Sequence, residues 1–471
     1  MKDHSAFQSE GRLDRPLLTL FIAIHTILLF NAIAHEPRIG YDAMNHLKYI
    51  EAFSSLNLPT VDQTTEFFSP PLPYLFPALL RHFGLDLWSS AKAAQLFNVF
   101  YSVILGVFLL KICDEVRPGD RRLKLLSLVL LGMLPVYYRS FALVRGEPLL
   151  AALSVFVAHR MLRLARSGGA TRQNCLLLGL GIGMMILSRQ WGFFLLPALV
   201  VFVCLRLWRM EEGRGKLVRA VAAALLIGAV TGGWFYGILL MRYGSVTAFN
   251  RNDRTELSLA NQPAEFYFGL GGGALFSRPV RPAFPNQLMP MLYADVWGDY
   301  WCYFDIFAID TTAGLLHSGP ALARALEDTA IRPSLKTNFE SMSRYLGRVN
   351  LISLLPSALL IVGVISGGVV TLGQLRGGAS SPSVALTFLF VLFTTLGYFW
   401  FLLSFLSPDK GEAIKGTYIL QVFPFVCILG GEQFVRIREH SPRTARVGMW
   451  LLALCALHNF PILFTRMTTL Y

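Results

Sequence analysis

Charged residues are scarce in this sequence. Asp, Glu, Lys and Arg make up only 15% of its 471 residues, whereas 54% are hydrophobic. Soluble domains average about 25% charged residues, so this composition excludes a soluble enzyme of the same length. Because a helix needs about 20 largely apolar residues to cross a bilayer, the apolar segments predict an all-α polytopic membrane protein with about 11 transmembrane helices. The predicted spans are 17–34, 89–112, 123–138, 148–165, 174–188, 190–208, 217–241, 350–374, 383–406, 417–435 and 446–465.

Cysteines and glycosylation signals are sparse as well. Of the six cysteines only Cys302 lies in a predicted outer loop, so no disulfide framework is indicated. The predicted outer loops contain no Asn-x-Ser/Thr acceptor sequence. The absence of these acceptor sequences, together with the absence of a retention signal, favours a bacterial inner membrane, whose outer side is the periplasm.

The basic residues indicate the orientation of the chain. Short connections on one side are rich in Lys and Arg (KICDEVRPGDRRLK, HRMLRLARSGGATR, RLWRMEEGRGKLVR and VRIREHSPRTAR), whereas those on the other side hold few. The positive-inside rule therefore predicts a cytoplasmic N-terminus. The net charge of +13 is largely explained by this bias, so it does not call for a nucleic-acid partner.

The first predicted outer segment, 35–88, has the pattern of an interfacial structure. A helix is expected over 41–56, where Ala43, Leu47 and Ile50 form one apolar stripe. Such a helix lies along the membrane surface. The proline-rich element PPLPY follows and leads into an apolar stretch that is a candidate for a second interfacial helix.

Two further outer segments are longer than turns. A large outer loop, 243–349, follows the seventh span, and a short segment, SPDKGEAIKGTYILQVFPF, joins the ninth span to the tenth. Ionisable groups are costly inside lipid, so function is expected at these outer segments rather than within the spans.

Three ionisable residues of the first outer segment are candidates for chemistry. Asp42 stands where it would cap the expected helix, and a carboxylate there also suits a general base at the membrane surface. The two roles are compatible in one residue. His46, one turn further on, is more often an interfacial side chain than a catalyst. Glu66 alone would be a solvated loop acid.

Several predicted outer turns carry cations. Arg145 and Glu147 lie between the third and fourth spans, Arg189 lies between the fifth and sixth, and Lys410 and Lys415 precede the tenth. Each cation alone could be an anchor whose charged head snorkels to the membrane surface. Together, opposite a loop that bears acids, they predict a site for an anionic headgroup, because arginine pairs well with phosphate.

The large outer loop contains acids interleaved with aromatic residues in YADVWGDYWCYFD. Asp295 and Asp299 in this pattern suit sugar or acceptor binding, since aromatic rings stack on sugars while carboxylates accept from their hydroxyls. An interfacial aromatic belt explains the pattern equally well. The acids do not form a recognised calcium loop and have no His/Cys ligand spacing beside them.

Taken together, these motifs resemble the GT-C superfamily of membrane glycosyltransferases, in particular bacterial members related to protein O-mannosyltransferases and aminoarabinose transferases. The features that match are an acid after the first span (Asp42), the PPLPYL element (Pro70–Leu75), an Arg-x-acid turn (Arg145, Glu147) and the late-span start KGTYILQVFP (Lys415, Tyr418, Pro424). Many relatives have two adjacent acids in the first loop, whereas Ala43 follows Asp42 here.

The resemblance implies a single GT-C-like transmembrane domain over 1–471 and an inverting sugar transfer on the outer face. The donor would be a polyprenyl-phosphate sugar, and the acceptor a lipid, a glycan or a protein. Asp42 would be the general base, and Arg145, Arg189 and Lys415 would be candidates for stabilising the departing phosphate. No cofactor is required by this chemistry, and a divalent metal stays open.

Other functions are compatible with a polytopic chain. A flippase or transporter of lipid-linked sugars usually has midplane polar residues, broken helices or inverted repeats. This sequence indicates no internal repeat, no discontinuous helix pair and no stripe of charge within its spans. A polymerase or ligase using a diphosphate-linked donor would usually lack the early acidic helix with its PPLPYL element, and a scaffold would not need Asp42.

Overall fold

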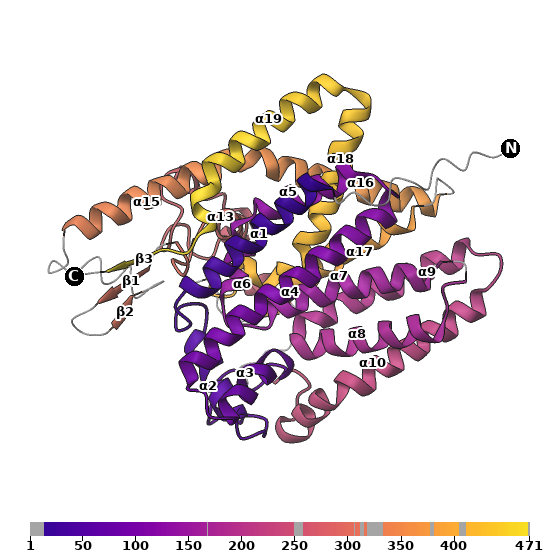
Figure 1. Cartoon of the computed structure of the whole chain (residues 1–471), viewed down its shortest axis with the longest axis horizontal. Helices are drawn as coiled ribbons and strands as arrows, with labels where there is room; N and C mark the ends of the chain where they lie inside the picture. Colours follow the sequence, from indigo (N-terminus) through magenta and orange to yellow (C-terminus); the bar gives the residue numbers. More distant parts are fainter. Residues whose placement is uncertain are drawn as a thin grey trace.

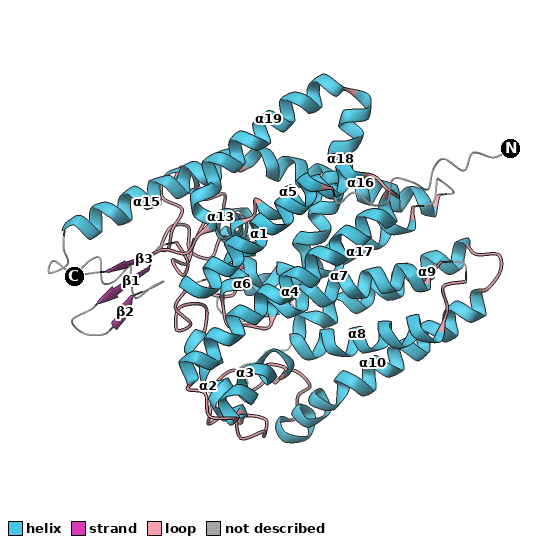
Figure 2. Ribbon diagram, in the orientation of Figure 1, coloured by secondary structure: helices cyan, strands magenta, loops and turns pink. Residues whose placement is uncertain are grey.

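The computed structural model describes residues 14–166, 168–248, 258–305, 307–310, 315–317, 333–376, 381–404 and 411–469. Long helices run side by side through most of the molecule, and a small sheet lies at one end of it (Figures 1 and 2). The elements of the first half are α1 (Arg15–Ala34), α2 (Ala43–Phe53), α3 (Leu72–His82), α4 (Leu87–Val116), α5 (Arg121–Gly132), α6 (Pro135–Ala142), α7 (Glu147–Leu164), α8 (Arg172–Ser188), η2 (Gln190–Leu195), α9 (Leu196–Arg209) and α10 (Arg214–Tyr243). The second half contains η3 (Leu259–Asn261), α11 (Ala264–Phe268), α12 (Ala274–Ser277), α13 (Leu288–Trp297), β1 (Phe307–Asp310), β2 (Leu315–His317), α15 (Pro333–Ile352), α16 (Leu354–Leu375), α17 (Pro382–Ser404), η4 (Gly416–Val422), α18 (Phe423–His440), α19 (Pro442–Asn459), η5 (Phe460–Leu463) and β3 (Met467–Thr469).

The prediction of an all-α polytopic membrane protein is confirmed. Eight helices in the described part of the chain are long and apolar enough to cross a membrane, and the bent pair α5–α6 makes nine if it is one span. Each of the eleven predicted segments coincides with helix over most of its described length. The number eleven is not confirmed, because α8 has only 17 residues and α7 is not among the eight.

One predicted span is broken. α5 ends at Gly132, α6 begins at Pro135, and the two helices are bent by 65°. Proline has no N–H, and the residue before it avoids the helical conformation, so α5 cannot continue through Pro135. The expectation that the chain has no discontinuous helix pair is therefore wrong. The bend directs α6, whose residues are all buried, into the end of the bundle that also holds α13.

Glycines allow two long helices, α8 and α10, to pack closely against each other. α8 and α10 lie along each other, and a Cβ on Gly232 of α10 would meet Ile186 Cγ1 at 2.5 Å. One turn earlier, a Cβ on Gly228 would meet Ile182 Cγ2 at 2.8 Å. Small residues four positions apart let helix backbones approach in membranes, where apolar burial alone does not drive helices together.

The first outer segment folds back onto the helices. α2 and α3 pack against each other and against α4, with Tyr49 and Tyr74 stacked at 4.2 Å between ring centroids. The predicted stripe of Ala43, Leu47 and Ile50 is buried in this contact. A helix therefore occupies most of 41–56, and a second one begins within the PPLPYL element.

The small sheet brings distant parts of the chain together. β1 pairs antiparallel with β2 and parallel with β3, which comes from the last residues described. The large outer loop thus contacts the C-terminal end of the chain at the left of Figure 1. Five described pieces of this loop (243–248, 258–305, 307–310, 315–317 and 333–349) are separated by residues outside the described part.

Candidate functional site

Asp42 begins α2 in an unusual backbone conformation. Its φ of 55° and ψ of 23° lie in the left-handed region, which aspartate tolerates better than most residues. Its carbonyl oxygen accepts the first helical hydrogen bonds, from the N–H groups of Asn45 and His46. Its carboxylate makes no capping hydrogen bond. The backbone of Asp42 therefore caps the helix, while its side chain, 42% exposed, is left for another partner.

That partner is Lys415. The Lys415 Nζ lies 3.5 Å from Asp42 Oδ2 and 3.2 Å from the Tyr418 hydroxyl. It also lies 5.0 Å from the centre of the Tyr41 ring, within cation–π distance. The Lys415 ammonium holds the pKa of Asp42 well below its usual range, so this carboxylate is ionised at neutral pH.

The backbone around this pair is held by buried groups. The Lys415 N–H donates to the Tyr398 hydroxyl at 2.8 Å. Asp295 accepts from the Tyr41 hydroxyl at 2.9 Å and from the Gly416 N–H at 2.6 Å. One buried carboxylate thus joins the residue before Asp42 to the residue after Lys415.

Arg145, Glu147, Arg189 and Glu66 form one buried network. Arg145 donates from Nε and Nη2 to the two carboxylate oxygens of Glu147, at 3.1 and 3.2 Å. Arg189 donates from Nε to Glu147 at 3.1 Å and from Nη1 to Glu66 at 3.2 Å. The two positive charges and the two negative charges neutralise one another. An unpaired charge buried inside the protein would be costly.

Arg145 also connects this network to the Asp42–Lys415 pair. Its Nη1 donates to the Tyr41 carbonyl at 2.8 Å, and its guanidinium lies 5.3 Å from the centre of the Tyr418 ring. Among Arg145, Arg189 and Lys415, only Lys415 has an acidic partner that is partly exposed rather than buried. It is therefore the cation best placed to change partners when an anion arrives.

His46 lies behind the acids. It is fully buried, and its Nδ1 is 2.7 Å from the Tyr74 hydroxyl and 3.9 Å from Glu66 Oε2. Burial lowers the pKa of His46 to about 4, so the ring is neutral at pH 7. It does not line the cavity described next. The position fits support of the network better than direct contact with a substrate.

A cavity of about 240 Å³ opens between these groups. Its lining consists of Asp42, Thr65, Glu66, Phe68, Arg189, Trp191, Phe401, Glu412, Ala413, Lys415 and Tyr418. Charged groups line it together with an aromatic cluster of Trp191, Phe401 and Tyr418. The Trp191 ring centroid is 4.6 Å from that of Phe401 and 5.4 Å from that of Tyr418. Aromatic rings beside carboxylates and cations suit a sugar phosphate.

Asp295 and Asp299, predicted as sugar or acceptor contacts, lie behind this cavity. Both are almost fully buried, and Arg139 Nη2 and Nη1 lie 3.0 Å and 3.7 Å from them, respectively. Asp299 accepts from the backbone N–H groups of Tyr303, Phe304 and Asp305. Arg139 is fully buried, so it is not an arginine that snorkels to the membrane surface. These ion pairs hold the large outer loop against the bundle.

Sequence reasoning missed part of the cavity wall. Phe401 and Glu412 belong to no motif, and Trp191 stands out only as the second residue after Arg189. Phe401 lies near the end of a long apolar span and resembles any other membrane-facing residue in the sequence. The predicted phosphate-binding residue Lys410 lies outside the described residues. Among those described, no group of three or more His, Cys, Asp or Glu could hold a metal ion.

No protein-family model and no curated protein sequence matches the chain. Solved structures do match it. The crystal structure of ArnT from Cupriavidus metallidurans bound to undecaprenyl phosphate has a TM-score of 0.51 and 15% sequence identity, covering 96% of this chain and 66% of that one. The apo oligosaccharyltransferase of Archaeoglobus fulgidus has a TM-score of 0.53 and 13% identity, covering 95% of this chain and 56% of that one.

Both of these proteins are GT-C superfamily members. This chain has the GT-C fold. A second structure of the A. fulgidus enzyme, a complex with zinc and sulfate, gives a TM-score of 0.52 at 12% identity over 95% of this chain and 53% of that one. The chain spans less than two thirds of the length of each of these proteins. The motif resemblance is therefore confirmed at the level of the fold.

Proposed function

We propose that this protein is a glycosyltransferase that moves a sugar from a polyprenyl-phosphate donor to an acceptor on the outer, periplasmic face of a bacterial inner membrane. The observation that carries the proposal is the Asp42–Lys415 pair at the wall of a cavity on a GT-C fold. Transfer of a sugar from a lipid phosphate needs two groups: a base that deprotonates the acceptor hydroxyl, and a cation that stabilises the departing phosphate.

The proposed reaction is a single displacement. Asp42 accepts the proton of an acceptor hydroxyl as the hydroxyl oxygen bonds to the anomeric carbon. The bond between that carbon and the phosphate oxygen breaks on the opposite face, so the configuration inverts. The electron pair goes to the polyprenyl phosphate, and the Lys415 ammonium stabilises its charge. The proton on Asp42 is then released to solvent.

Arg145 and Arg189 are proposed to assist at the phosphate. Both are already paired with Glu147 or Glu66, so they offer a positive field but few free donor groups. Lys415, whose ammonium contacts the partly exposed Asp42, is proposed as the first contact. His46 and Glu66 are proposed to keep the arginines in place. Asp295 and Asp299 are proposed to hold the large outer loop beside the site.

The cavity favours a donor that carries one sugar. Pockets for drug-sized ligands are about 300–1,000 Å³, so a cavity of about 240 Å³ suits a single ring rather than an oligosaccharide. The ring would stack on the aromatic cluster of Trp191, Phe401 and Tyr418. The acceptor is a lipid, a glycan or a protein, and no nucleic acid takes part.

The test uses protein purified into nanodiscs with radiolabelled polyprenyl-phosphate sugars. Wild type should release label from the lipid, and Asp42→Asn should slow release by about 10²–10⁴-fold, the usual contribution of a general base, while still binding the donor. Asp62→Asn, an exposed acid in the same outer segment, is the matched control. Equal turnover by Asp42→Asn and wild type would reject Asp42 as the base.

A flippase of lipid-linked sugars is the second candidate, and the broken α5–α6 pair is the observation that favours it. The charged residue on α6, Arg139, is neutralised by Asp295 and Asp299 rather than facing a pathway. Liposomes distinguish the two functions. Scrambling of a fluorescent lipid-linked sugar without consumption of donor would support the flippase and reject the transferase.

A further inference from the structure

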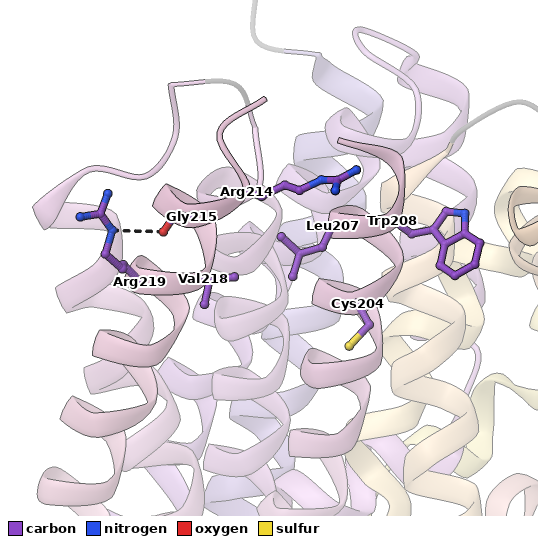
Figure 3. A pocket seen from close by; sticks show the side chains of 7 residues that line it. All are labelled: Cys204, Leu207, Trp208, Arg214, Gly215, Val218 and Arg219. Atoms are coloured by element: carbon purple, nitrogen blue, oxygen red, sulfur yellow. Dashed lines mark hydrogen bonds between the residues drawn. The ribbon is translucent and has the colours of Figure 1, made fainter. Parts of the chain in front are cut away.

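A second recess lies at the end of the bundle away from the candidate site. It has a volume of about 790 Å³ and is lined by Cys204, Leu207, Trp208, Arg214, Gly215, Val218 and Arg219 (Figure 3). The candidate site adjoins Arg189, just before the span 190–209, and this recess lies at the far end of the same span. Arg189 and Leu207 are 18 positions apart, which at about 1.5 Å per residue corresponds to about 27 Å, close to the thickness of the hydrocarbon core.

The recess is a groove between α9 and α10, which pack against different neighbouring helices. α9 packs on α17, whereas α10 packs along α8. Leu207 comes from α9 and Val218 from α10, and the two helices stand apart at this end in Figure 3. Both helices are long and apolar enough to cross a membrane, α9 together with the short η2. A groove between two such helices is open sideways to lipid chains.

Trp208 stands at the rim of this groove. Its side chain is largely apolar, yet the residue is 76% exposed. Tryptophans in membrane proteins gather at the headgroup level, where an apolar ring and a polar N–H are both satisfied. This places the mouth of the groove at the membrane surface.

Two arginines provide a positive charge at this mouth. Arg214 donates from Nε to the Met210 carbonyl at 2.6 Å, and Arg219 donates from Nε to the Gly215 carbonyl at 3.2 Å. These bonds leave the Nη groups of both side chains without a protein partner among the described residues. Arg214 and Arg219 are exposed, and the groove they flank is otherwise apolar.

The other charged residues nearby do not enter the groove. Arg206 donates to the Ala165 carbonyl and Arg209 to the Gln374 carbonyl, and neither residue lines the recess. Three further charged residues, Glu211, Glu212 and Lys216, are exposed in or beside the α9–α10 connection and do not line the recess. The charge that faces the groove is therefore positive.

We propose that this groove binds one anionic phospholipid from the leaflet opposite the candidate active site. Its phosphodiester pairs with Arg214 and Arg219, and an acyl chain lies along Leu207 and Val218. Basic pockets between transmembrane helices bind anionic headgroups through the same combination of charge and apolar wall. The site is independent of the proposed sugar transfer.

Tryptophan quenching by brominated lipids tests this binding. Protein is reconstituted in nanodiscs that hold increasing fractions of dibrominated phosphatidylglycerol or dibrominated phosphatidylcholine. The Trp208 signal is the difference between wild type and Trp208→Phe. We expect half-maximal quenching of Trp208 at a several-fold lower fraction of the anionic lipid. Raising the salt to 1 M should weaken this preference, because the Debye length falls to about 3 Å.

Variants separate headgroup binding from simple contact with lipid. Each arginine near a membrane surface contributes about 1 kcal/mol to the binding of anionic lipid, so Arg214→Gln with Arg219→Gln should abolish most of the several-fold preference seen in wild type. Arg172→Gln, an exposed arginine at the start of α8, is the matched control and should keep it. Equal quenching by both lipids in wild type, or an unchanged preference in the double variant, would overturn the proposal in favour of arginines that only snorkel.

Discussion

The Lys415 ammonium lies 3.5 Å from the Asp42 carboxylate, although the two residues are 373 positions apart in the chain. The two side chains are brought together because the backbone next to each of them is held by the same buried residue. Asp295 accepts hydrogen bonds from Tyr41 and Gly416, which adjoin the two residues of the pair. A residue of the large outer loop that does not line the cavity thus determines how the two groups that line it face each other.

Removing Lys415 should make Asp42 easier to protonate. The ammonium lowers the pKa of Asp42, so Lys415→Gln should raise that pKa towards the ordinary value of about 4. Activity that depends on ionised Asp42 should then fall at a higher pH on acidification than in wild type. The measurement is kcat/KM for the donor against pH.

The same variant should bind polyprenyl phosphate more weakly, which a binding titration measures separately. Lys48→Gln, an exposed lysine on α2, is the control for loss of one positive charge. If kcat/KM of Lys415→Gln and of wild type fell at the same pH on acidification, Lys415 would not control the ionisation of Asp42.

Asp295→Asn should lower both the stability and the transferase activity of the protein. Arg139 is fully buried and would lose its closer ion-pair partner, 3.0 Å away. Breaking a buried pair by removing one partner costs about 3–5 kcal/mol. Thermal unfolding in nanodiscs should show a lower midpoint than wild type.

The double variant Arg139→Met with Asp295→Asn tests whether the loss of stability comes from leaving Arg139 buried without its partner. It removes the stranded charge of Arg139, while Asp299 keeps its three backbone N–H donors, so it should recover part of the lost stability. It should not recover the activity, because an asparagine in place of Asp295 would hold Tyr41 and Gly416 less well. A double variant as unstable as the sum of the two single variants would argue against pairing as the cause.

Gly232→Ala should loosen the contact between α8 and α10. The added Cβ would lie 2.5 Å from Ile186 Cγ1, and overpacking of this kind costs about 1–3 kcal/mol. Gly233→Ala is a matched control, because a Cβ there has nothing within 4 Å. The midpoint of thermal unfolding should fall for the first variant and stay or rise for the second. Similar midpoints for both would show that the helices can separate without cost.

Stability should fall on acidification because of buried histidines. Burial lowers the pKa of His46 to about 4, and that of His35 likewise to about 4. Between about pH 4 and 6.5 the unfolded state binds more protons than the folded state, so stability rises with pH across this window and is lost as the pH falls through it. The shift of His46 corresponds to about 3 kcal/mol.

His46→Gln should therefore flatten the dependence of the unfolding midpoint on pH across this window, leaving the part due to His35. His82→Gln, an exposed histidine on α3, should leave the slope as it is. If the His46 variant kept the full wild-type slope, the buried ring would not be the group that titrates.

Much of the architecture could be predicted because its signals are local. Each long apolar run is helical, and the apolar stripe of 41–56 is the buried face of α2. The break at Pro135 is also present in the sequence but is easily overlooked, because an apolar run on both sides of a proline looks continuous when only its hydropathy is considered.

The partners within the site were harder to predict. Arg145 and Glu147 are two residues apart, and their pairing follows from that spacing. The sequence does not indicate that Arg189 joins this pair to Glu66, or that Asp295 faces Arg139 rather than a sugar. Which acids neutralise which cations depends on how several helices and loops meet.

The sequence by itself determined that this chain is a helical membrane protein, with its ionisable residues in the connections, because lipid tolerates neither exposed backbone polar groups nor unpaired charge. Only the tertiary structure decided that Asp42 and Lys415 face one cavity and that Asp295 holds their neighbours Tyr41 and Gly416 by hydrogen bonds. Those contacts join segments hundreds of residues apart, and their geometry follows from the close packing of whole helices rather than from any local pattern.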